Sequence, residues 1–149
     1  TVNSRGYGMT FINAAVKFFA AGLKNIFDDT VTDLWAYIHF STHQYRNATG
    51  NSNLTTYVNI TGGKKYKVDL YMHTRFRIAT VASIPATGTT LTNYLYDALD
   101  TNGTTAVNAT RTLEITAGAS DTVLIIFYWT NTGTMAAADI RKTIKVYEE

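Results

Sequence analysis

Alternating apolar and polar residues run through most of the chain after residue 31 and predict β-strands. The clearest segment starts at Lys64, where every second residue is apolar. The alternation resumes with Phe76 and Ile78 on the apolar face, which leaves Arg75 and Arg77 facing outward. This pattern predicts long strands with one face in the core and the other in solvent.

Two further segments are apolar or aromatic on both faces, which indicates strands that are covered on both sides. They are DLWAYIHFS (33–41) and DTVLIIFYWT (121–130). Shorter strand patterns, a Gly-Gly turn at 62–63 and a loop before the closing segment complete the series: TTYVNIT (55–61), RTLEIT (111–116), the loop NTGTMAAAD (131–139) and IRKTIKVYEE (140–149). The fold class predicted is mainly β, a single antiparallel β-sandwich of the jelly-roll kind over residues 31–149.

Residues 10–27 have a different period and predict an amphipathic helix inside an N-terminal arm of residues 1–30. Its apolar stripe consists of Ile12, Val16, Phe19, Leu23, Ile26 and Phe27. The helix has three possible partners: its own sandwich, copies of itself or a neighbour, and a membrane surface. A membrane-bound helix usually has a strongly basic polar face, and two lysines are few for that role. We favour oligomerisation through these residues and expect a homotrimer with the helices near its axis.

Composition narrows the classes of partner. The 149 residues suit one domain, and no run of 18 apolar residues exists that would predict a membrane span. The net charge is +2 without a long basic block, so no nucleic-acid partner is expected. Only 16% of residues are charged, against about 25% in ordinary domains. Threonine and asparagine take the surface positions instead, as suits virion and extracellular β-proteins.

The search for catalytic motifs favours a protein that is not an enzyme. The three histidines have no metal-ligand spacing, and no serine lies in a GxSxG sequence. Cysteine is absent, which excludes disulfides and thiolate ligands. We therefore expect no catalytic residues, no metal site and no cofactor.

The order of segments from Arg75 to Glu149 carries a resemblance. An RFR strand leads through a Pro/Gly turn to a Thr-rich strand, then to the apolar strand that ends FYW, and finally to IKVYE. This order resembles the carbohydrate-binding-like β-sandwich modules of bacteriophage tail, baseplate and fibre proteins, over about residues 64–149. The resemblance implies a structural protein of the virion, as a fibre, decoration or tail-appendage subunit among other virion proteins.

The same resemblance implies host-surface glycan as a candidate ligand. Sugar sites combine an aromatic face with side chains that hydrogen-bond hydroxyl groups. The candidate residues are Trp129, Tyr94, Tyr96, Arg75, Arg77 and Asp97. The alternative for Trp129 is a core position or a subunit contact. Arg75 and Arg77 could equally form salt bridges with Asp or Glu of a neighbouring subunit, and Asp97 could be an ordinary surface turn residue.

Five Asn-x-Thr sequons support a second interpretation. They lie at Asn47, Asn53, Asn59, Asn102 and Asn108. In a secreted protein such sequons are acceptors for N-linked sugar. The alternative function is a glycosylated subunit of an archaeal or bacterial extracellular filament or surface layer, located at the cell surface.

Overall fold

The computed structural model describes residues 23–30, 34, 36–39, 41–48, 53–72, 74–97, 109–130 and 137–149. These residues form a mainly β structure with one short helix. The elements are β1 (Ala36–Ile38), β2 (Tyr45–Asn47), β3 (Asn53–Asn59), β4 (Lys65–Met72), β5 (Thr74–Val81), β6 (Tyr96–Asp97), β7 (Ala109–Thr116), β8 (Val123–Thr130), α2 (Ala137–Thr143) and β9 (Lys145–Glu148). No helix among these described residues is long and apolar enough to cross a membrane.

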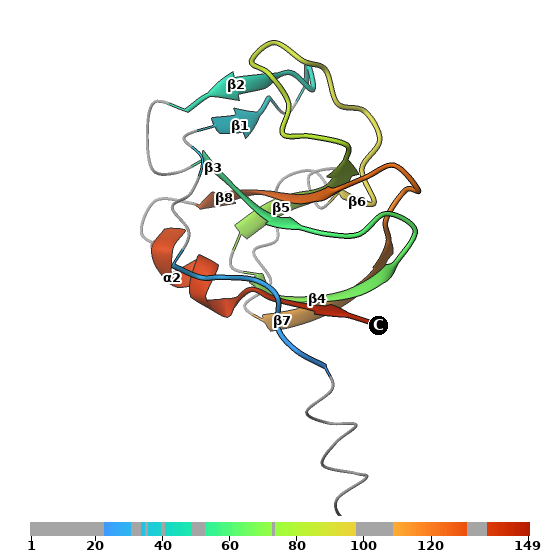
Figure 1. Ribbon diagram of the computed structural model, residues 1–149. Coiled ribbons are helices and arrows are strands. Elements are labelled where there is room, and N and C mark those ends of the chain that lie inside the picture. The colour runs from blue at the N-terminus through green and yellow to red at the C-terminus, as the bar shows by residue number, and fades with distance from the viewer. Residues whose placement is uncertain are drawn as a thin grey trace, which may run out of the picture.

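The strands form three antiparallel sheets. The largest has the order β3-β8-β5-β6, the second has the order β7-β4-β9, and the third is the pair β1-β2. The sheets lie in three layers, with β1-β2 on one side of the four-stranded sheet and β7-β4-β9 on the other (Figure 1). Both faces of the central sheet are therefore covered.

Strand β8 shows how the sequence specifies this layering. Its even-numbered residues, Leu124, Ile126 and Tyr128, belong to the core between the two larger sheets. Its odd-numbered residues, Val123, Ile125 and Phe127, belong to a second core beneath β1 and β2. Successive side chains of a strand point to opposite faces, so an apolar strand needs cover on both. The prediction of a strand covered on both sides is confirmed for β8.

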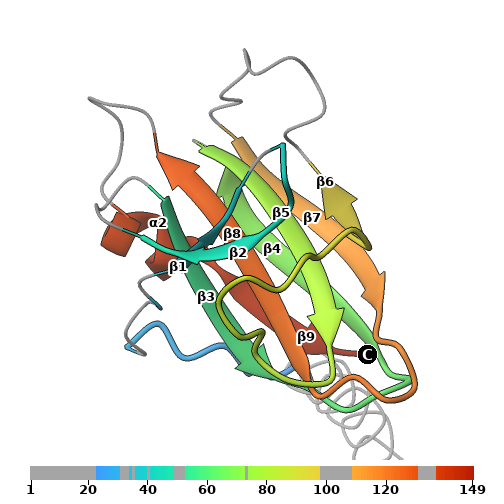
Figure 2. The same cartoon turned by 90° about the horizontal axis from the view of Figure 1, so that it is seen from above.

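The strand pairs are nested along the chain. β5 pairs with β6 in one sheet, β4 with β7 in the other, and β3 with β8 in the first sheet again. β5 also pairs with β8, which joins the outer and inner pairs of that sheet. The chain thus runs as a long antiparallel double strand whose successive pairs alternate between two sheets (Figure 2).

Other predicted elements are also found. In β4, Tyr66, Val68 and Leu70 are fully buried, as the alternation predicts. The turn after β3 lies at Gly62 and Gly63. Gly63 has a φ of 77°, and a Cβ at Gly62 would collide with the backbone of Gly118 and Ala119, at the turn between β7 and β8.

The closing segment differs from the prediction. We expected a loop through residue 139 and a strand from 140, whereas Ala137–Thr143 form helix α2 and the strand starts at Lys145. Asp139 lies in the first helical turn and two basic residues lie in the last, an arrangement that the helix dipole favours. Ile140 is fully buried on this helix and fills the end of the larger core.

The predicted helix over 10–27 is not helical in its last five residues. Residues 23–27 run as extended chain beside β9, where Asn25 forms a β-bridge with Tyr147. The amide of Ile26 donates to the carbonyl of Val146 at 2.8 Å. Pairing with a strand edge satisfies these backbone groups, which an isolated helix end would leave open. The rest of the predicted helix lies outside the described residues.

Candidate functional site

The candidate site is built on the cross-strand pair Arg77 and Asp97. These residues are directly opposite each other where β5 meets β6, so their side chains share one face of the sheet. Arg77 Nε donates a hydrogen bond to Asp97 Oδ1 at 3.0 Å. The Arg77 side chain is only 4% exposed, whereas 27% of the Asp97 side chain is exposed. Our prediction that Arg77 faces outward is therefore wrong.

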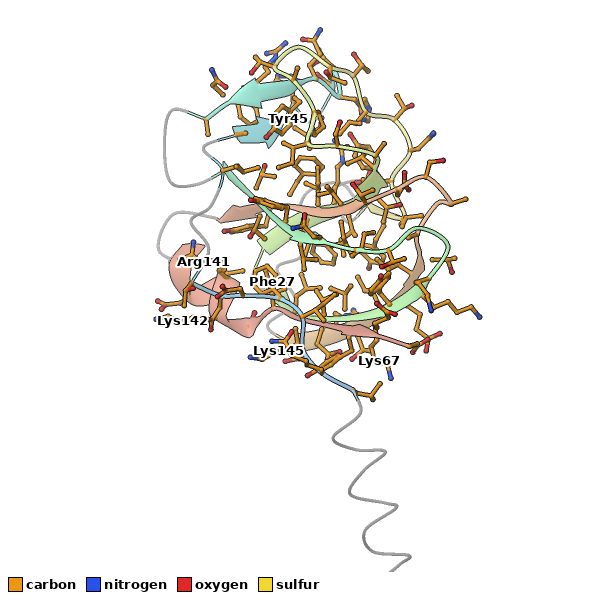
Figure 3. All side chains as sticks on the ribbon, viewed as in Figure 1. Phe27, Tyr45, Lys67, Arg141, Lys142 and Lys145 are labelled. Carbon is orange, nitrogen blue, oxygen red and sulfur yellow. The ribbon has the colours of Figure 1, made fainter. Side chains whose placement is uncertain are left out.

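The reason is that the second face of β5 has its own covering layer. This layer consists of β1-β2 and the segment that leads from β5 to β6. The amide of Tyr45 donates to the Thr89 carbonyl at 2.8 Å, and the amide of Leu91 donates to the His43 carbonyl at 2.9 Å. Tyr45 lies in this upper layer (Figure 3), and its ring packs edge-on against the ring of Phe127 in β8. A period of two marks two faces, but it does not reveal that a distant segment covers the polar one.

Tyr94 completes the cluster from the covering segment. The Arg77 guanidinium carbon lies 4.6 Å from the centre of the Tyr94 ring, within the range of a cation–π interaction. The Tyr94 hydroxyl donates to the Leu91 carbonyl at 2.7 Å. Burial raises the pKa of Tyr94, with a smaller opposing effect from the positive charge of Arg77. The ring is thus held neutral against a buried cation.

His43 is the member that the sequence pattern did not indicate. Its Nδ1 lies 3.1 Å from the Tyr94 hydroxyl, and the two rings are 5.7 Å apart. His43 also has a φ of 55°, in the left-handed region, within the turn before β2. No signal in the sequence marks this histidine, because its polar loop resembles any other surface loop.

The other residues that were predicted to bind sugar are not found in the cluster. Tyr96 stacks on Phe76 at 4.9 Å with 8° between the rings. It therefore points to the opposite face of the sheet, toward the larger core. The backbones of Arg75 and Trp129 are directly opposite each other in β5 and β8. Their side chains are not among those that the structure describes. Three of the six candidates thus meet: Tyr94, Arg77 and Asp97.

The cluster is arranged for stability more than for chemistry. Its guanidinium, carboxylate and phenol bind one another, and Arg77 is shielded from any ligand in solvent. Among the described residues, no three histidine, aspartate or glutamate side chains are grouped so that they could hold a metal ion. The geometry therefore favours an internal polar contact that fastens the covering layer to the central sheet.

The described residues among those predicted for oligomerisation differ in their exposure to solvent. Leu23 is 47% exposed, whereas Phe27 is 5% exposed in the core of its own chain. Ile26 is half-buried and packs against that same core. Ile12, Val16 and Phe19 lie outside the described residues. Phe27 therefore anchors the arm to its own chain and offers no surface to another.

Asn25 fixes the point at which the arm meets the sheet. Its Oδ1 accepts hydrogen bonds from the amides of Phe27 and Val146, at 3.1 and 2.9 Å. Its Nδ2 donates to the Phe27 carbonyl at 3.1 Å. One side chain thus joins the arm to β9. Sequence reasoning missed Asn25 because a single polar residue in an apolar stretch has no distinctive pattern.

Two of the five sequon asparagines are placed on the surface. Asn47 and Asn59 are exposed at the ends of β2 and β3. Asn53 begins β3, and its side chain is not among those described; Asn102 and Asn108 lie outside the described residues. Asn47 and Asn59 are therefore accessible to modification.

We compared the chain with known proteins in three ways. A scan against protein-family models, a search of curated proteins and a search of solved structures each found no match to the chain.

Proposed function

We propose that this chain is a structural, self-assembling subunit of a bacteriophage virion, used as a fibre, decoration or tail-appendage protein. The observation that supports this proposal best is that the described sheets, once Ile26 and Phe27 are packed, leave no apolar face for the earlier residues of the stripe. Ile12, Val16 and Phe19 would then be covered by other copies of the chain.

The central sheet has no free face. One face packs in the core with β4, β7 and β9, and the other packs beneath β1 and β2. The outer face of the β7-β4-β9 sheet carries polar side chains and needs no cover. Lys67 and Lys145 lie on this outer side in Figure 3, and Thr112 donates to Asp69 there at 2.6 Å.

The attachment of the arm supports the same proposal. Asn25, Ile26 and Phe27 are bound to β9 and the core, whereas Leu23 is already exposed. The apolar residues Ile12, Val16 and Phe19 precede this anchor in the sequence. Burying an apolar side chain of this size contributes about 1.5–3 kcal/mol. Three copies of the stripe around one axis would bury it, which is our reason for proposing a homotrimer.

We further propose that the two larger sheets form a jelly-roll sandwich. Support comes from the nested pairs β3·β8, β4·β7 and β5·β6, which alternate between the sheets. A long double strand wound in this way is the topology of jelly rolls, which are common in viral capsid domains. The β1-β2 pair and β9 are additions to that scheme.

Glycan binding receives less support than assembly. The polar candidates Arg77 and Asp97 bind each other, and Tyr96 is stacked in the core. The exposed Asn47 and Asn59 keep the glycosylated extracellular filament as the second candidate function. Mass spectrometry of the sequon peptides from the native source separates the two, because a filament subunit would carry sugar on these asparagines.

The assembly proposal is tested by charging the stripe in the full chain. The variant Val16→Asp with Phe19→Asp should lower the mass of the particle measured by light scattering to that of a single chain or a smaller oligomer. The matched control, Asn13→Asp with Lys17→Glu, changes the opposite side of the predicted helix and should keep the mass. An identical mass for both double variants and the unmodified chain would overturn the proposal.

A further inference from the structure

Strand β7 is the long strand in the described part of the chain whose second edge makes neither a strand pairing nor a bridge with other described residues. It pairs with β4 over all eight of its residues. The outer edge of β9 is occupied by Ile26, and that of β3 is bridged by Leu34. At the far end of the central sheet, β6 has only two residues. In Figure 2, β7 lies on the side of the molecule opposite α2.

The hydrogen-bond pattern of β4 shows which groups of β7 face outward. The amide of Ala117 donates to the Lys64 carbonyl at 2.9 Å, so these two residues form a hydrogen-bonded pair. The Lys65 carbonyl instead accepts from Glu149 on the other side of β4, at 3.0 Å. Such pairs alternate along an antiparallel ladder. The residues of β7 whose N–H and C=O groups point away from β4 are therefore Thr110, Thr112, Glu114 and Thr116.

We propose that two copies of this chain pair β7 to β7, antiparallel, about a two-fold axis. The contact joins two three-stranded sheets into one of six strands. Exposed strand edges readily pair with a second chain, and the backbone groups supply most of the attraction. This contact is separate from the N-terminal one and goes beyond the proposed function. A two-fold contact together with the N-terminal contact would give the subunit two different ways to join its neighbours, as a repeating assembly requires.

The outward groups restrict the register of the contact. Outward residues must pair with outward residues, so the axis passes through Thr112, Leu113 or Glu114 near the strand centre. An axis through Glu114 sets two carboxylates directly opposite, which is destabilising. An axis through Thr112 sets the apolar Leu113 against Arg111 of the second copy.

An axis through Leu113 sets no carboxylates opposite each other and pairs Leu113 with its own copy. Arg111 then lies opposite Ile115, which is already buried in the core of its own chain. Leu113 is half-buried at the margin of the larger core, and its copy across the axis would cover the exposed part.

On the outer face, Glu114 then lies opposite Thr112 of the second copy. Lys67 is opposite Glu114 within the chain, and Asp69 is opposite Thr112. A neutral threonine therefore separates the two carboxylates along this row, so no like charges lie directly opposite, and we assign the axis to Leu113.

The test uses single cysteines in the full chain, which has none of its own. Leu113→Cys places two thiols opposite each other across the axis, at the close Cα separation of a non-hydrogen-bonded pair, about 4.5 Å. This distance lies within the range that a disulfide spans. Thr112→Cys and Glu114→Cys are the matched controls, because each would face a different residue in the second copy. Far-UV circular dichroism checks that all three variants keep the β structure.

The expected result is a disulfide-linked dimer with Leu113→Cys after mild oxidation, formed at least tenfold faster than with either control. Equal rates for the three variants, or no dimer with Leu113→Cys in the folded chain, would overturn the proposal. A faster dimer with Thr112→Cys or Glu114→Cys would overturn the assigned axis. The cross-link should persist when Val16→Asp and Phe19→Asp are added, so its outcome is distinct from that of the N-terminal test.

Discussion

The guanidinium of Arg77 and the carboxylate of Asp97 form an ion pair beneath the covering layer, with 3.0 Å between Nε and Oδ1. The arginine is almost wholly buried, and the aspartate is partly open to solvent. The Tyr94 ring packs against the guanidinium, whose central carbon lies 4.6 Å from the ring centre. The pair joins β5 to β6, and through Tyr94 it fastens the segment between them.

Removing the carboxylate should destabilise the protein, because a buried cation loses its charged acceptor. We expect Asp97→Asn to lower the free energy of unfolding by about 1–3 kcal/mol. Adding Arg77→Met should recover part of this loss, since an apolar side chain of similar length needs no partner. Urea unfolding followed by tryptophan fluorescence measures both changes.

The control for this pair is Lys142, whose bond to Asp139 is exposed on α2. Lys142→Gln should change the free energy of unfolding by less than about 1 kcal/mol. If Asp97→Asn costs no more than Lys142→Gln, the cluster does not hold the covering layer.

The Asn25 side chain should contribute strongly to the free energy of unfolding, because it makes three hydrogen bonds to the backbone. We expect Asn25→Ala to cost about 1–3 kcal/mol of unfolding free energy. The amide of Val146 should also exchange with deuterium faster, since its acceptor is lost. The exposed neighbour Lys24 is the control, and Lys24→Ala should change stability by no more than about 0.5 kcal/mol. Unchanged exchange at Val146 would contradict the anchoring role.

The buried Tyr45 and the half-buried Tyr94 should make the protein less stable in alkali. Burial raises the pKa of both Tyr45 and Tyr94 above the ordinary 10.0. Above pH 10 the unfolded chain loses these protons first, so it binds fewer protons than the folded chain. Stability is therefore constant with respect to these groups below pH 10 and falls as the pH rises further.

The alkaline effect is measured as the urea midpoint between pH 8 and 11. The double variant Tyr45→Phe with Tyr94→Phe should show a shallower fall above pH 10 than the unmodified chain. Equal slopes in the two proteins would show that these phenols are not protected in the folded state.

Helix α2 should contribute to the core although it is short. Ile140 is fully buried between the larger sheets, so Ile140→Ala removes apolar contacts and leaves a cavity. We expect a loss of about 2–5 kcal/mol in the free energy of unfolding. Lys142→Ala, on the exposed side of the same helix, should have little effect. A loss below about 1 kcal/mol for Ile140→Ala would mean that α2 packs loosely.

Local alternation was sufficient to predict the strands whose two faces differ or are both apolar. In β4, Tyr66 and Val68 are buried while Lys65 is exposed, and each position follows from a period of two. The two-faced apolar pattern of β8 likewise predicted its central place. These features follow from residues that are adjacent in the sequence, so they can be predicted from one sequence alone.

Features that depend on distant segments were not predicted. Arg77 is polar and alternates correctly, yet it is buried because residues far along the chain cover it. Asn25 lies in an apolar stretch that reads as helix, but its bonding partners are on β9. In both cases tertiary contacts outweigh the local preference, and a pattern within one segment contains no information about them.

The central claim, that this chain is a self-assembling structural subunit, is tested most directly by the mass of the unmodified full chain in solution. Sedimentation velocity over a hundredfold range of concentration should show a species of three times the 16.5 kDa mass of one chain, or a larger assembly built from it. A single 16.5 kDa species at every concentration would contradict the account.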